Sequence, residues 1–121
     1  MDAKRSELKR QYKMTPPPMG VYRIRNLENG KVMIGSAMNL PGILNSNRFQ
    51  LKMGSHPNKE LLAEWKFLGE EKFVFEVLDE LDPKDEAPDH DYRADLAALE
   101  ELWIEREQPF GVRGYHLKGT K

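Results

Sequence analysis

The chain has 121 residues, which suits one domain that buries a modest core. It contains no cysteine, so disulfide bonds and Cys-based zinc sites are excluded. No apolar run approaches the ~20 residues that a membrane-spanning helix needs, and the polar N-terminus lacks the pattern of a secretory signal. We therefore expect a cytoplasmic protein that makes no contact with a membrane.

The formal net charge of −1 conceals an uneven distribution along the chain. Residues 1–59 carry 11 Lys or Arg against three acids, whereas residues 60–121 carry 8 basic residues against 17 acids. Proteins that bind nucleic acid gather positive charge on one face. The basic half is the candidate for such a face, although segregation along the sequence need not become segregation in space.

Residues 1–18 are predicted to form an N-terminal segment, distinct from a main domain over residues 19–121. The segment is basic and helix-prone, and Leu8 and Tyr12 stand one turn apart, the spacing of a contact that fixes a short helix to the body. A basic arm that touches phosphates is the alternative. The run Pro16-Pro17-Pro18 then ends any helix before the first strand.

The stretch 20–36 is predicted to be a β-hairpin. Asn29-Gly30 is a strong hairpin signal because both residues tolerate a positive φ. Tyr22 lies two residues before Ile24, so the two side chains share one face of the first strand. β-branched residues stand on both sides of the turn: Val21, Ile24, Val32, Ile34.

Two helices are predicted after the hairpin. Asn39 is the expected cap of the first, with Pro41 in its first turn and Gly54 at its end. The second begins at Asn58 and ends at Gly69. Its apolar residues recur at helical spacing and form one stripe: Leu61, Leu62, Trp65, Leu68.

A third strand is predicted over residues 72–78, where Phe73, Phe75 and Val77 share one face. With a last helix near the C-terminus, the order of elements is β-β-α-α-β-α. This order predicts an α+β fold, a three-stranded antiparallel β-sheet flanked by helices.

Residues 79–95 are rich in acids and contain prolines. They lack the regular spacing and central glycine of a calcium loop, so we predict a solvated loop. His90 is expected to be exposed within it, and Asp95 is expected to cap or open the last helix.

Glu100 has unusual surroundings for a carboxylate of the predicted last helix. An ionised carboxylate on an apolar face is costly unless it is paired or bound to a metal. Glu100 is therefore a candidate metal ligand, and a rim glutamate with its head in solvent is the alternative. Its neighbours three and four residues away are all apolar: Leu96, Ala97, Trp103, Ile104.

Taken together, these motifs resemble the GIY-YIG nuclease superfamily over about residues 19–117. The run Gly20-Val21-Tyr22 is similar to the first triplet of the family, and Met33-Ile34-Gly35 to the second. Asn39-Leu40 and the late run from Leu99 to Ile104 also stand where the family has them. The resemblance implies a GIY-YIG endonuclease-like fold and metal-dependent phosphodiester hydrolysis of DNA.

The resemblance also implies roles for single residues. Tyr22 corresponds to the tyrosine that positions or deprotonates the attacking water, and Glu100 to the glutamate that binds one divalent ion, Mg²⁺ or Mn²⁺, weakly. His116 stands where the family has an asparagine and is the third catalytic candidate. The candidate nucleic-acid-binding residues are basic side chains that could line a phosphate-binding face: Lys31, Arg48, Lys52.

Four positions depart from the family pattern: Met33 replaces an aromatic residue, Ile43 an arginine, Asn47 a histidine and His116 an asparagine. Ile43 matters most because an isoleucine cannot neutralise a phosphate. Arg48 stands nearby but points in a different direction on a helix. We therefore expect weak cleavage. The alternative is a catalytically inactive module that binds nucleic acid or protein.

His56 lies in a loop similar to one of the family, and we interpret it as a structural capping residue. His56, His90 and His116 do not have the spacing of a three-histidine metal site.

Overall fold

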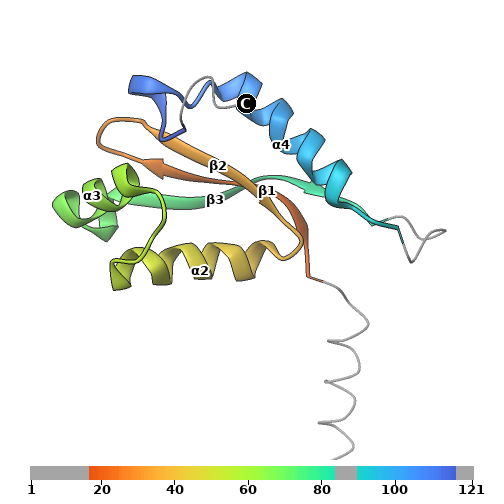
Figure 1. The fold of residues 1–121 in the computed structure, drawn as a ribbon, viewed down its shortest axis with the longest axis horizontal. Coiled ribbons are helices and arrows are strands. Elements are labelled where there is room, and N and C mark those ends of the chain that lie inside the picture. Colours follow the sequence, from red (N-terminus) through yellow and green to blue (C-terminus); the bar gives the residue numbers. More distant parts are fainter. Residues whose placement is uncertain (1–16, 84–89, 117–121) are drawn as a thin grey trace, which may run out of the picture.

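The computed structural model describes residues 17–83 and 90–116. The N-terminal segment predicted over residues 1–18 therefore lies mostly outside the described residues, as do the middle of the acidic segment and the last five residues. The described elements follow the predicted order (Figure 1): β1 Met19–Asn26, β2 Val32–Ala37, α2 Leu40–Met53, α3 Lys59–Leu68, β3 Phe73–Leu81 and α4 Arg93–Glu107, with 3₁₀ turns at Glu70–Lys72 and Gly111–Arg113.

The three strands form one antiparallel sheet with β1 in the centre, in the order β2-β1-β3. The predicted α+β fold is confirmed. Asn29 and Gly30 lie in the turn between β1 and β2, but only Gly30 adopts a positive φ, of 78°. Asn29 contributes in another way, because its side-chain oxygen accepts a hydrogen bond from the Lys31 amide.

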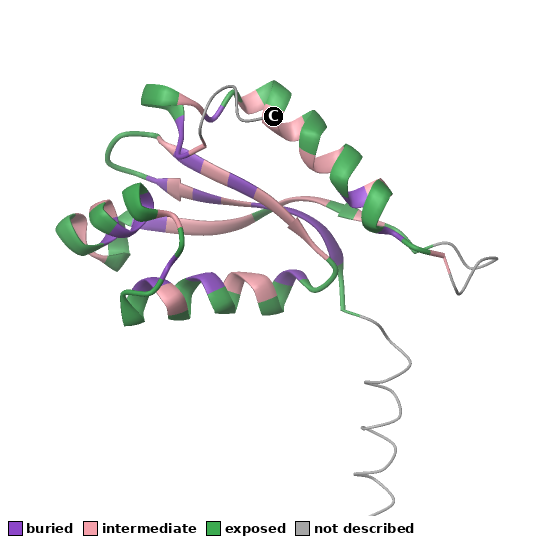
Figure 2. Ribbon diagram, in the orientation of Figure 1, coloured by how far each residue is buried: buried purple, intermediate pink, exposed green. Residues whose placement is uncertain are grey.

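Helices cover both faces of the sheet, with α2 and α3 on one side and α4 on the other (Figure 1). Side chains alternate along β1, so Tyr22 and Ile24 enter the larger core beneath α2 and α3, as predicted. Val21 enters a second core beneath α4, with Val32, Ile34 and partly buried residues of that helix. The purple stretches of the strands in Figure 2 mark both cores.

The predicted helix boundaries after the hairpin are confirmed, because local chemistry sets them. The Asn39 side chain accepts from the Gly42 amide at 2.9 Å, and Asn58 caps α3 by accepting from Leu61. Each helix ends at a glycine with a positive φ, 77° at Gly54 and 96° at Gly69.

The acidic segment departs from the predicted loop at both ends. Asp79 to Leu81 belong to β3, because β1 begins at Met19 and offers hydrogen-bonding partners as far as Leu81. At the other end α4 begins at Arg93, so Asp95 lies in its first turn and does not cap it. The Asp95 carboxylate pairs with His90 Nε2 at 2.6 Å, so His90 is half-buried and not fully exposed.

No helix in the described ranges has the length and apolar character needed to cross a membrane.

Candidate active site

Tyr22 reaches the outer edge of β2 by lying across Gly35. The two residues are paired in the β1–β2 register. A Cβ atom on Gly35 would stand 2.5 Å from the Tyr22 hydroxyl and 2.6 Å from its Cζ, well inside contact distance. The glycine is therefore required at this position, since any side chain would displace the ring.

Glu100 reaches the same edge from α4. The Ser36 hydroxyl donates a hydrogen bond to Glu100 Oε1 at 2.6 Å, and Ser36 follows Gly35 directly on β2. Burial raises the pKa of the Tyr22 phenol, a hydrogen bond with Asn47 offsets part of that rise, and the negative charge of Glu100 adds to it. Tyr22 and Glu100 thus meet at one end of β2, although they come from opposite faces of the sheet.

His116 lies against the same strand. The backbone amide of Ile34 donates to His116 Nε2 at 2.9 Å, so the proton of the neutral ring is on Nδ1. Burial lowers the pKa of His116, which keeps the ring neutral near pH 7. The structure therefore gathers all three catalytic candidates, from β1, α4 and residues 108–116, which we call the C-terminal segment.

The C-terminal segment covers the outer edge of β2. Gly114 bridges to Val32, and the Tyr115 amide donates to the Val32 carbonyl at 3.0 Å. Together with the bond between Ile34 and His116, these contacts occupy backbone groups that would otherwise face solvent.

A polar network that the sequence does not predict fixes this segment. The Tyr115 hydroxyl donates to Glu64 Oε1 at 2.5 Å, and Asn26 Nδ2 donates to both, at 2.9 Å to Glu64 and 3.1 Å to Tyr115. Burial alone would raise the pKa of Glu64, but these hydrogen bonds, one from Asn29 and the charge of Lys31 bring it below its usual value. The signal in the sequence that could have indicated this network is Glu64, a glutamate within the apolar pattern of α3.

The three candidate phosphate-binding cations lie in different surroundings. Lys31 is only 16% exposed and pairs with both Glu60 and Glu64. Arg48 and Lys52 are exposed on α2, with the Arg48 guanidinium 4.3 Å from the Phe75 ring centroid. The structure therefore groups Arg48 with Lys52 and sets Lys31 apart in an ion-pair network.

Asn47 and His56 form a buried pair next to Tyr22. The Asn58 amide donates to His56 Nδ1 at 3.0 Å, so Nε2 carries the proton and donates to Asn47 Oδ1 at 2.6 Å. Asn47 in turn donates to the Ile43 carbonyl and hydrogen-bonds Tyr22. His56 is thus a structural residue, as interpreted, and it also orients the amide that holds the Tyr22 hydroxyl.

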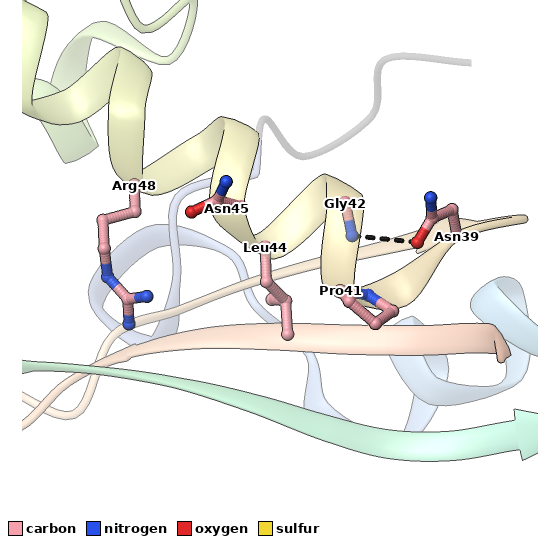
Figure 3. A pocket seen from close by; sticks show the side chains of 6 residues that line it. All are labelled: Asn39, Pro41, Gly42, Leu44, Asn45 and Arg48. Atoms are coloured by element: carbon pink, nitrogen blue, oxygen red, sulfur yellow. Dashed lines mark hydrogen bonds between the residues drawn. The ribbon is translucent and has the colours of Figure 1, made fainter. Parts of the chain in front are cut away.

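Arg48 lies away from the edge of the sheet where Tyr22 and Glu100 meet. Residues five apart on a helix stand about 140° apart around its axis. Ile43 packs against the larger core, whereas Arg48 extends over Phe75 on β3, at the opposite edge of the sheet from Gly35. Figure 3 shows Arg48 and Leu44 pointing from α2 toward the sheet, beside a hollow of about 470 Å³.

Metal ligands are few at the site. In residues 17–83 and 90–116, no three His, Asp or Glu side chains come together as a metal-binding group. The Nε2 atom of His116 already accepts a hydrogen bond from the Ile34 amide, so it is not free to bind a metal ion. Of the two candidate ligands at this edge, Glu100 is therefore the one that can face a cation beside Tyr22.

The fold is similar to that of a GIY-YIG nuclease catalytic domain, which confirms the fold expected from the sequence. The catalytic domain of the homing endonuclease I-TevI matches with a TM-score of 0.66 and 24% identity, covering 80% of this chain and 95% of that one. A mutant of the same domain, described as an intron endonuclease, matches at 0.65 and 22%, covering 86% and 97%. No family model and no curated protein matches the chain.

Proposed function

We propose that the protein hydrolyses phosphodiester bonds in DNA as a weak, metal-dependent GIY-YIG-type nuclease. The observation that carries the proposal is the meeting of Tyr22 and Glu100 over Gly35 and Ser36, in the fold of a nuclease domain. We assign the activity to the domain over residues 19–121 and treat residues 1–18 as an accessory segment.

Tyr22 acts as a hydrogen-bonding group for the attacking water. Burial raises its pKa, so the phenol keeps its proton at neutral pH and is a poor general base. Asn47, held by His56, fixes the direction of the hydroxyl. A water oriented in this way starts closer to the geometry that in-line attack on phosphorus needs.

Glu100 is the residue that would hold the divalent ion. Oε1 accepts from Ser36, and in the described part of the chain Oε2 has no hydrogen-bond partner, so one carboxylate oxygen can face a cation. Mg²⁺ often binds through one carboxylate with waters and substrate phosphate, and such sites are weak. A bound Mg²⁺ or Mn²⁺ would stabilise negative charge on the phosphate and the leaving oxygen.

Slow cleavage follows from Ile43. Its apolar side chain packs in the core where the family places an arginine, so position 43 offers no cation to balance the phosphate. Loss of one such electrostatic contact typically lowers the rate by about 10²–10³. The same observation favours a second candidate, a module that binds nucleic acid without cleaving it.

The test is cleavage of single-stranded, double-stranded and branched DNA with Mg²⁺ or Mn²⁺. We expect slow cleavage that Glu100→Ala abolishes and that Glu101→Ala, a matched change at the exposed neighbouring position, retains. Cleavage that survives Glu100→Ala would overturn the proposal. DNA binding without cleavage under every condition would favour the second candidate.

A further inference from the structure

Helix α2 differs in charge from the other helices of the described chain. Its sequence contains no acid, whereas α3 contains two and α4 five. Six of its residues line a hollow of about 420 Å³, and we call them the α2 outer surface: Gly42, Asn45, Ser46, Arg48, Phe49, Lys52.

Phe49 is the apolar member of this surface and is 62% exposed. A single exposed aromatic residue is ordinary. Here, however, Arg48 precedes it directly, and Lys52 stands three residues later on the adjacent turn. On the helix both cations stand to the same side of the ring. An aromatic face beside cations is the combination that binds single-stranded nucleic acid, because bases stack on the ring while phosphates meet the positive charges.

Both cations are available to a ligand. The structure gives Arg48 no carboxylate partner among the described residues, and its guanidinium rests on the Phe75 ring. Lys52 lies 3.8 Å from Glu70, and both side chains are at least half exposed. An exposed pair at that distance contributes little, so a phosphate can replace the carboxylate.

From these observations we infer that the α2 outer surface binds single-stranded DNA, with one base stacked on Phe49 and the flanking phosphates on Lys52 and Arg48. Asn45 and Ser46 supply hydrogen bonds beside the hollow that Gly42 leaves open. Single strands fit better than duplex, because the faces of paired bases are buried in the stack and cannot lie on Phe49.

This inference rests on the proposed function, since it specifies the form of DNA that the domain takes. The inner side of α2 carries Asn47, which hydrogen-bonds Tyr22. A helix with its side chains is about 10–12 Å across. A strand held on the outer side therefore passes within a few nucleotides of the Tyr22 hydroxyl.

The experiment is fluorescence anisotropy with labelled single-stranded DNA, duplex DNA and single-stranded RNA, in EDTA so that cleavage cannot interfere. The variant Phe49→Ala loses the ring on which one base stacks, so its affinity for single-stranded DNA should be about 5- to 150-fold lower than that of the native chain. The matched control is Phe67→Ala, since Phe67 is 88% exposed but lies on α3. It should leave the affinity nearly unchanged, and thermal melting should show that both variants fold.

Lys52→Gln adds an independent readout. Each phosphate contact to a single strand contributes about 0.7 to the slope of log affinity against log salt concentration, so the variant should lower the slope by about that amount.

Three results would overturn the inference: equal binding by Phe49→Ala and the native chain, equal losses in both Phe variants, or tighter binding of duplex or RNA. A dimer that Phe49→Ala dissociates, without DNA binding, would assign the surface to a second copy and would also overturn it. Cleavage of duplex DNA without single-strand binding would reject the inference while the proposed function survived.

Discussion

The two edges of the sheet divide the parts of the candidate nuclease site between them. At the β2 edge lie Tyr22 and Glu100, with a covering segment that includes His116, and no Lys or Arg of residues 17–83 and 90–116 forms an ion pair with Glu100. Toward the β3 edge, Arg48 rests on Phe75 without a carboxylate partner in the described chain. The comparison shows that the chain has both kinds of charge that phosphodiester chemistry needs, but on opposite sides of α2.

Moving a cation to the β2 edge should give the largest effect. Ile43→Arg, alone and with Met33→Tyr, should raise the cleavage rate by about 10²–10³. The guanidinium would place a positive charge near the negative charge that develops on the phosphate in the transition state. Rates are measured at saturating DNA. Arg48→Lys, which keeps a cation on the β3 side, should leave that rate unchanged, and a large loss there would show that Arg48 already serves the site.

A side chain at Gly35 should displace the Tyr22 ring at the β2 edge and leave the β3 edge of the sheet unchanged. Gly35→Ala places a Cβ within contact distance of the Tyr22 ring, so we expect a loss of about 1–3 kcal/mol in unfolding free energy and loss of cleavage. Urea denaturation and the cleavage assay measure the two effects. Ser36→Ala is the matched change, and it should keep the Tyr22 position and most of the stability. Equal stability losses in the two variants would contradict this reading of Gly35.

Removing the acceptor of the polar network should loosen the covering segment. Glu64→Gln should cost about 1–3 kcal/mol at pH 7, as loss of a charged acceptor from a half-buried network does. The folded-state pKa of Glu64 is below its usual value, so its contribution is present above about pH 4.5 and is lost as the pH falls through the folded pKa. The urea midpoints of the native chain and of Glu64→Gln should therefore differ clearly at pH 7 and only slightly at pH 3. An equal difference at both values would argue against the network.

The buried histidines should give the smallest effect. Burial lowers the pKa of both His56 and His116, so the unfolded chain binds more protons below about pH 6.5 and stability falls there. His116→Asn removes one titrating ring, so the stability loss between pH 7.5 and pH 5.5, measured by urea denaturation, should shrink. If His116→Asn leaves the pH dependence as large as before, the ring is not buried neutral.

Local elements were predictable because neighbours in the sequence determine them. Asn39 and Asn58 cap their own helices, and Gly30 makes its own turn. The extent of β3 was not predictable, since the pairing available along β1 decides where it ends.

The polar parts of the site were harder to predict, because their partners are distant in the chain. The bonds from Glu64 span 38 residues to Asn26 and 51 to Tyr115. Tyr22 was a candidate only through the family resemblance, and Glu100 also through its apolar helix neighbours. The support of Tyr22 by Asn47 and His56 depends on how α2 meets the following loop. The periodicity of the sequence does not predict a contact between a helix and the loop that follows it.

The segment that covers β2 also sets the order in which the site can be assembled. Ile34 and His116, which share a hydrogen bond, are 82 residues apart. A ribosome releases β1 and β2 early, and at that stage the outer edge of β2 has no neighbour. The nascent chain therefore carries an open sheet edge until residues 114–116 have emerged, and the candidate active site is completed only after this late segment is available.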